Sequence, residues 1–124
     1  MGPRENKQTA QEAYAAFSSG DAEAAMANVD DSIEWTVRGD NALTGTHRGR
    51  QAVGELWATL ATADYRTEPH DFIADGDKVV VLATTRVGGQ ADESVDVLTY
   101  NADGKPIAFD SFGNWTMFDR AFGK

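Results

Sequence analysis

Residues 96–123, DVLTYNADGKPIAFDSFGNWTMFDRAFG, contain two apolar segments that predict neighbouring antiparallel strands followed by a short aromatic tail. The turn-forming residues 101–105, NADGK, lie between the two segments. Asp96 stands among Val95, Val97 and Leu98, where a strand is normally buried. A carboxylate with apolar neighbours either faces the interior, where burial changes its pKa, or turns outward to water. Asp96 is therefore the first candidate for chemistry.

Working outward from this stretch, a period of two indicates that the second half of the chain is a series of strands. The residues between consecutive strands include Asp75-Gly76-Asp77, which predicts a tight hairpin turn, and residues 88–92, which predict a looser turn. The predicted strands are residues 65–74, 78–87, 93–101 and 106–114.

The first half of the chain has the period of helices. Apolar residues recur at helical spacing over residues 10–17 and again over residues 22–29. Thr9 begins the sequence TAQE, which fits a capping box early in the first helix. Gly20 is expected to end this helix, and Asp21 to cap the next one.

A strand, a loop and a third helix follow. Residues 33–37 alternate apolar and polar side chains, residues 39–49 carry three glycines without a period, and residues 53–61 have the strongest helical stripe. Three helices followed by consecutive antiparallel strands predict an α+β fold, with the helices packed on one face of a curved sheet. We expect residues 1–124 to form a single domain.

Composition excludes several classes of partner. The formal net charge is −9 and the eleven Lys and Arg residues are scattered, so neither nucleic acid nor an anionic membrane is an expected partner. The chain has no cysteine and no apolar run of ~20 residues, which excludes disulfides, thiolate metal sites and a membrane-spanning helix. The opening residues MGPRENKQ are too polar for a secretory signal, so we expect a cytoplasmic location.

The order of predicted elements resembles the nuclear transport factor 2-like (cystatin-like) fold, and local motifs are similar to those of SnoaL-like proteins. These motifs are AYAAFSSGDAEAAMANVDDSIEW (residues 13–35), LTGTHRGRQAV (43–53), HDFIADGD (70–77) and Gly104-Lys105. The resemblance implies a cone in which the curved sheet and three N-terminal helices enclose an apolar pocket. The superfamily is a scaffold for isomerases, cyclases, epoxide hydrolases, dehydratases and non-catalytic binders, so the fold alone does not give the function.

Against ketosteroid isomerase, the resemblance places Asp96 on the protonated aspartic acid of the oxyanion hole. That carboxyl is an established example of an acid kept neutral by an apolar site. The isomerase's first-helix tyrosine falls near Ala13, with Tyr14 one position away, and its general base falls near Thr36. Only one of the three essential groups therefore matches in place.

Against two other enzyme families the match is also incomplete. Arg86 matches the arginine of limonene epoxide hydrolase, but Gly88 and Ser111 stand where its two aspartates belong. In SnoaL-like polyketide cyclases the acid–base pair is a histidine and an aspartate. Asp96 replaces the histidine, and Asp110 matches the aspartate only if the alignment moves by about one residue. None of these three catalytic sets is complete.

The candidate catalytic residues are Asp96, Arg86 and His70. If Arg86 faces inward beside Asp96, it favours the carboxylate and lowers its pKa; otherwise burial raises that pKa. The alternatives are an exposed Arg86 at the end of its strand and a structural, hydrogen-bonded His70. His47 and His70 form no metal motif, and no cofactor is expected. The expected ligand-contacting residues are Tyr14, Trp35, Trp57, Tyr100, Phe109 and Ser111.

Three functions remain open from the sequence. The first is cofactor-free acid–base catalysis (an isomerase, cyclase, hydrolase or dehydratase) on a hydrophobic, oxygen-bearing small molecule. The second is non-catalytic binding of such a molecule, and the third is a protein-interaction module that uses the outer sheet face. We also expect a homodimer through that face, because three helices cannot cover both faces of one sheet.

Overall fold

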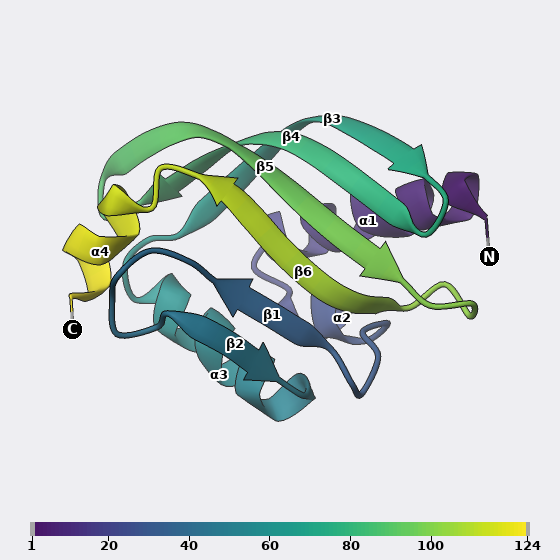
Figure 1. The fold of residues 1–124 in the computed structure, drawn as a ribbon, viewed down its shortest axis with the longest axis horizontal. Coiled ribbons are helices and arrows are strands. Elements are labelled where there is room, and N and C mark those ends of the chain that lie inside the picture. The colour runs from purple at the N-terminus through teal and green to yellow at the C-terminus, as the bar shows by residue number, and fades with distance from the viewer. Residues whose placement is uncertain (1, 124) are drawn as a thin grey trace.

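The computed structural model describes residues 2–123, which form four helices and six strands (Figure 1). In chain order the elements are α1 (Pro3–Ser18), α2 (Ala22–Met26), β1 (Glu34–Val37), β2 (Gly45–Arg48), α3 (Arg50–Ala61), β3 (Arg66–Asp75), β4 (Lys78–Val87), β5 (Gln90–Tyr100), β6 (Pro106–Gly113) and α4 (Thr116–Phe122).

The six strands make one curved sheet in the order β2-β1-β6-β5-β4-β3. Strands β3 to β6 form the predicted antiparallel meander, and their long ribbons bend over the N-terminal helices (Figure 1). Strand β1 is the exception, because it pairs in parallel with β6 and places Trp35 beside Phe109. The predicted α+β fold with a curved sheet is confirmed.

Alternation along the strands decides which side chains face the helices. In β4, Val79, Val81 and Ala83 are buried, and the residues between them are more exposed. Strand β5 pairs with β4 so that Asp96 lies opposite Val81, and Asp96 therefore faces the same interior. The other face of the sheet carries exposed apolar side chains, among them Leu82.

The start of α1 differs from the prediction. The helix begins at Pro3, well before the expected cap at Thr9, and proline fits the first helical turn because its missing N–H needs no partner there. Thr9 is therefore a mid-helix residue whose hydroxyl donates to the carbonyl of Glu5, so the capping-box prediction is wrong. The second cap is confirmed, since the Asp21 carboxylate accepts a hydrogen bond from the Ala24 N–H.

The structure contains two short elements that the sequence pattern does not predict. The expected loop at residues 39–49 contains β2, which pairs with β1 at the sheet edge, and the expected aromatic tail is helix α4. Strand β5 also begins at Gln90, so its turn is a tight one at Gly88-Gly89, where both glycines have positive φ. Helix α4 buries Met117 and Phe118 against the helical side of the core.

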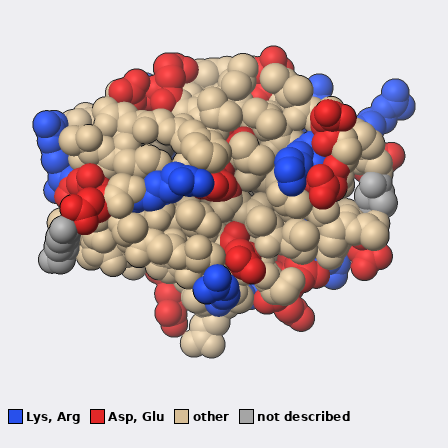
Figure 2. Space-filling view, viewed as in Figure 1, with Lys and Arg blue, Asp and Glu red and all other residues tan. Residues whose placement is uncertain are grey.

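The core has two parts with Trp35 in contact with both. One cluster joins the helices α2, α3 and α4, and the other lines the concave face of the sheet around Val81 and Phe109. On the face shown in Figure 2, acidic and basic side chains are interspersed and form no continuous basic patch. Within residues 2–123, no helix is both long enough and apolar enough to cross a bilayer.

Candidate functional site

Asp96 is the buried carboxyl at the centre of the interior. It lies on β5 with only 2% of its surface exposed. The Tyr14 hydroxyl from α1 donates to Asp96 Oδ2 at 2.6 Å, and the Ser111 hydroxyl from β6 donates to Asp96 Oδ1 at 2.7 Å. Ser111 reaches this position because it is the cross-strand partner of Asp96 in the sheet register. Each carboxyl oxygen therefore has its own hydroxyl donor.

Burial and these hydrogen bonds act on Asp96 in opposite directions. Loss of water raises the pKa of Asp96, and this effect outweighs the lowering by the Tyr14 and Ser111 hydroxyls. The pKa of Tyr14 is raised well above its usual value, first by burial and then by the negative charge of Asp96. Tyr14 thus stays protonated and keeps its donor role, while Asp96 is the group that can change its protonation state.

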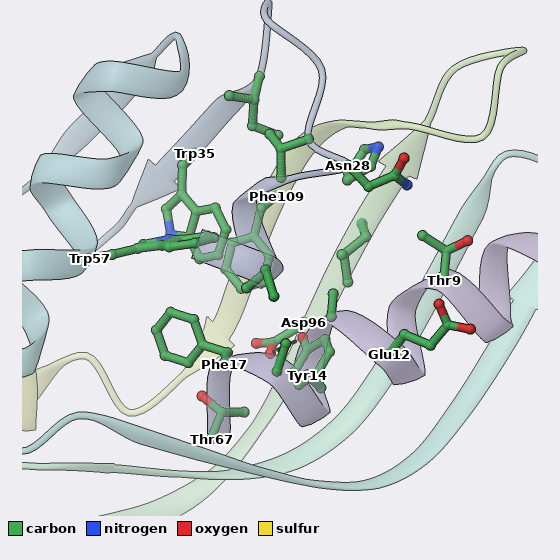
Figure 3. A pocket seen from close by; sticks show the side chains of 18 of the residues that line it. Thr9, Glu12, Tyr14, Phe17, Asn28, Trp35, Trp57, Thr67, Asp96 and Phe109 are labelled. Carbon is green, nitrogen blue, oxygen red and sulfur yellow. Dashed lines mark hydrogen bonds between the residues drawn. The ribbon is translucent and has the colours of Figure 1, made fainter. Parts of the chain in front are cut away.

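A cavity of about 610 Å³ lies over Asp96 between the helices and the sheet (Figure 3). Trp35 and Phe109 stack in one of its walls, with ring centroids 3.7 Å apart and planes 14° apart. Trp57 meets Trp35 edge to face at 5.5 Å. The lining also includes Thr9, Glu12, Ala13, Tyr14, Ala16, Phe17, Ser18, Ala24, Ala25, Asn28, Val29, Ile33, Tyr65, Thr67, Asp96, Leu98, Tyr100, Asp103, Gly104 and Pro106.

Aromatic and polar side chains are unevenly distributed around the cavity. Figure 3 shows the rings of Trp35 and Trp57 at one end, and the side chains of Thr9 and Glu12 at the opposite end. Asp96 lies between the two ends (Figure 3). Such a cavity can hold a mainly hydrophobic molecule and present it with one buried carboxyl.

Arg86 does not join Asp96. Its side chain is 51% exposed, and its guanidinium donates to Glu68 at 2.9 Å on the outer face of the sheet. The prediction that it pairs with Asp96 is wrong, because alternation in β4 directs Val87 inward and Arg86 outward. Without a guanidinium beside it, Asp96 has the raised rather than the lowered pKa.

His70 also lies outside the cavity. The sequence places it on the face of Phe72, but a bulge between Pro69 and Asp71 breaks the alternation at this point. The ring lies on the outer face, where its Nε2 is 2.6 Å from the Thr84 hydroxyl. The geometry matches the structural alternative for His70 rather than the catalytic one.

The structure places most of the other residues predicted from the sequence in the cavity wall and leaves two outside it. Ser111 bonds Asp96, and the cavity wall includes Tyr14, Trp35, Trp57, Tyr100 and Phe109. Asp110 faces outward, as alternation with the inward Ser111 predicts, and it forms an ion pair with Arg38. The Thr36 side chain points toward the neighbouring Thr46 hydroxyl, 3.4 Å away, rather than toward the cavity.

The sequence missed two features of the site. It placed Tyr14 in the wall but did not identify it as the hydroxyl that bonds Asp96, although the helical stripe that contains Tyr14 was visible. It also missed Tyr65, just before β3, and Thr67, near the start of β3; both line the cavity, and the Thr67 hydroxyl donates to the Tyr65 hydroxyl at 3.0 Å. Among residues 2–123, no three His, Asp or Glu side chains converge as a metal site.

Comparisons with known proteins agree with this architecture. A solved nuclear transport factor 2-like protein from Burkholderia xenovorans LB400 is 29% identical, with a TM-score of 0.80 and 99% of both chains covered. TerC, co-crystallised with polyporic acid, is 27% identical with a TM-score of 0.81, covering 94% of this chain and 97% of TerC. A Xanthomonas campestris protein with a cystatin-like fold is 22% identical with a TM-score of 0.88, covering 100% of both chains.

The sequence comparisons give the family. No curated protein sequence matches the chain at a significant level. A sequence profile of the SnoaL-like domain matches residues 10–120, which is most of the chain. The chain therefore belongs to the SnoaL-like domain family and has the nuclear transport factor 2-like fold.

Proposed function

We propose that this protein binds a hydrophobic, oxygen-bearing small molecule in the cavity and that Asp96 exchanges a proton with it without a cofactor. The observation that carries the proposal is the Asp96 carboxyl, 2% exposed, with the Tyr14 and Ser111 hydroxyls on its two oxygens. A buried carboxyl is costly unless its surroundings compensate it, and such groups are common in sites that move protons.

Both protonation states of Asp96 have a use at this position. The neutral acid donates a hydrogen bond or a proton to a ligand oxygen, whereas the carboxylate accepts a proton from the ligand. Burial raises the pKa of Asp96 and so brings its titration closer to neutral pH than that of an exposed aspartate. Tyr14 and Ser111 hold the Asp96 carboxyl in one orientation while it gains and loses its proton, so they are positioning residues.

The similarity to TerC suggests a probe. TerC was co-crystallised with polyporic acid and aligns over 94% of this chain, so polyporic acid is the first compound to titrate. Its affinity is measured by calorimetry from about pH 5 to pH 9, a range that lies above the ordinary pKa of an exposed aspartate. We expect affinity for the wild type to change with pH.

Asp96→Asn keeps the side-chain shape and removes the titration. The matched control is Asp110→Asn on the outer face, where the carboxylate pairs with Arg38 instead of facing the cavity. Polyporic acid also ionises, so we expect the Asp96 variant to lose only the part of the pH dependence that its carboxyl contributes, and the Asp110 variant to keep the wild-type profile. Equal pH profiles for all three proteins would show that the Asp96 carboxyl does not act on the ligand.

Binding without turnover is the alternative within the same cavity. Among residues 2–123, Asp96 is the one fully buried carboxyl, and the lining carboxylates of Glu12 and Asp103 are exposed, so the site offers one acid–base group rather than a pair. A binder keeps the pH-dependent affinity but returns the compound unchanged after incubation, as mass spectrometry of the recovered ligand would show.

We also propose that the protein is located in the cytoplasm, which cell fractionation would test.

We also propose a homodimer through the outer face of the sheet. Ile73, Leu82 and Phe112 on the long strands are 48%, 39% and 44% exposed, which is unusual for large apolar side chains in a strand face left in water. A second copy would cover them. Light scattering should give twice the chain mass of 13.4 kDa at micromolar concentration, and a monomer would contradict this proposal.

A further inference from the structure

The ring of Phe17 lies in the wall at the aromatic end of the cavity. Phe17 belongs to the last turn of α1, and its ring meets those of Trp57 and Tyr65 edge to face, at 5.0 Å and 6.1 Å between ring centroids. Figure 3 shows this ring on the side of Trp57 rather than on the side of Glu12. The three rings come from α1, from α3 and from the residue before β3, so together they close the space between the helices and the sheet.

A groove on the outside of the molecule lies beyond this wall. It runs between α2, α3 and the start of β3, and its lining includes the small residues Gly54 and Ala58 of α3. Some residues line both the cavity and the groove, and these are Phe17, Ser18, Trp57, Tyr65 and Thr67. Residues that border both spaces form the partition between them. The removal of a side chain from this partition would therefore extend the cavity into the groove.

Within the partition, Phe17 is the residue that separates the two spaces by its bulk alone. Trp57 is 7% exposed and also packs against Trp35, and the Tyr65 hydroxyl is bonded to that of Thr67. Phe17 is only partly buried, because its ring borders open space on both sides. Its ring can thus be changed with less effect on the core than that of Trp57.

The opposite end of the cavity is polar and open to water. Glu12 and Asn28 line this end and are exposed (Figure 3). The Asn28 amide donates to the Gly104 carbonyl at 3.3 Å, which brings the β5–β6 turn and the exposed Asp103 to the same rim. The apolar part of a ligand is driven out of water and into contact with aromatic rings. It therefore points away from this rim and toward Phe17.

We infer that Phe17 is a specificity-determining residue whose ring limits how far the apolar part of a ligand extends beyond Asp96. This inference rests on the proposed function, because it assumes that the cavity holds a small molecule. The ligand class is then a compact, ring-containing molecule that has no long alkyl chain at its inner end. The limit on length does not depend on proton exchange by Asp96, so the inference can fail while the proposed function stands.

A homologous series of probes measures the length of the cavity. The 4-n-alkylphenols from 4-ethylphenol to 4-heptylphenol share one oxygen-bearing ring and differ by one methylene at each step. Their affinities are measured by ligand-observed NMR for the wild type, Phe17→Ala and Phe17→Trp. The matched control is Phe122→Ala, since Phe122 is also a partly buried ring packed against the helical part of the core but is not part of the cavity wall.

In the wild type, affinity should rise about 3- to 4-fold for each added methylene until the chain reaches Phe17, and then stop rising. In Phe17→Ala the rise should continue for about two further methylenes, and in Phe17→Trp it should stop earlier. Phe122→Ala should keep the wild-type limit. A rise through the whole series in the wild type, or the same limit in Phe17→Ala, would overturn the inference and leave the proposed function in place. If the wild type binds no member of the series, the proposed function fails and the inference fails with it.

Thermal unfolding shows whether the variants remain folded. Phe17→Ala and Phe122→Ala each remove a partly buried ring from the same core, so both should have a lower melting temperature than the wild type. If Phe17→Ala does not fold, Phe17→Leu replaces it, because leucine keeps most of the apolar contact with Trp57. Phe17→Leu should move the limit by about one methylene. An unmoved limit in this folded variant would equally overturn the inference.

Discussion

Asp96 links the stability of the protein to pH. Its pKa in the folded state is raised above the ordinary value of 3.8, mainly by burial. The folded protein therefore holds this proton more tightly than the unfolded chain does. The resulting stabilisation is fully present below the pKa of the unfolded carboxyl and is lost as the pH rises through the raised pKa of the folded state.

Tyr14→Phe tests the hydrogen bond to this carboxyl. The Tyr14 hydroxyl favours the charged form, so its loss should destabilise the protein by about 1 kcal/mol when Asp96 is neutral and by about 2–3 kcal/mol when it is ionised. Urea unfolding at several pH values measures this difference. Tyr100→Phe is the control, because its hydroxyl has no bonding partner among residues 2–123. A Tyr14→Phe effect that shrinks as the pH rises would contradict the hydrogen-bond assignment.

At the scale of elements, the strongly periodic strands could be predicted from the sequence. Which face of each strand lies toward the interior could not. The period along β4 predicts a strand, but Val79 and Val81 on one face are as apolar as Val80 and Leu82 on the other. Nothing within β4 therefore says on which side Arg86 lies. The curvature of the sheet and the packing of α1 settle the question.

The other wrong predictions made from the sequence also have local causes. The bulge at His70 adds a residue to β3 and reverses the alternation. Pro69, which directly precedes it, is a residue type that occurs in sheets mainly at edges and bulges, but it does not say which residue is the extra one. Strand β2 is only four residues long and begins at Gly45, so no period could be recognised. By contrast, the resemblance places Asp96 inward and the alternation with Phe109 places Ser111 inward, and the structure puts their side chains in contact.

Helix α4 offers a prediction at this scale. Phe118 is 7% exposed and its ring meets those of Trp115 and Tyr65, so α4 closes the helical part of the core. Phe118→Ala should lower the free energy of unfolding by about 3–4 kcal/mol, because it leaves a cavity among rigid aromatic neighbours. Urea denaturation would measure the change. A loss below about 1 kcal/mol would show that α4 contributes little to the fold.

At the scale of the whole molecule, the curved sheet uses its two faces differently. The concave face encloses the cavity, and the convex face exposes the apolar side chains proposed to form the dimer. Leu82→Glu should convert the dimer to a monomer in light scattering, since a carboxylate at the centre of an apolar interface is not compensated. Lys105, in the β5–β6 turn, gives the control substitution Lys105→Glu, which should leave the dimer intact. A dimer that persists in the Leu82→Glu variant would contradict the proposed interface.

The most direct test of the central claim is the titration of the Asp96 carboxyl carbon by ¹³C NMR, with and without polyporic acid. The Asp96→Asn spectrum assigns the signal. We predict a pKa above the ordinary value of 3.8 in the free protein and a further change when the ligand binds. A signal that titrates like an exposed aspartate and does not move when the ligand is bound would show that Asp96 is not the proton-exchanging group of the site.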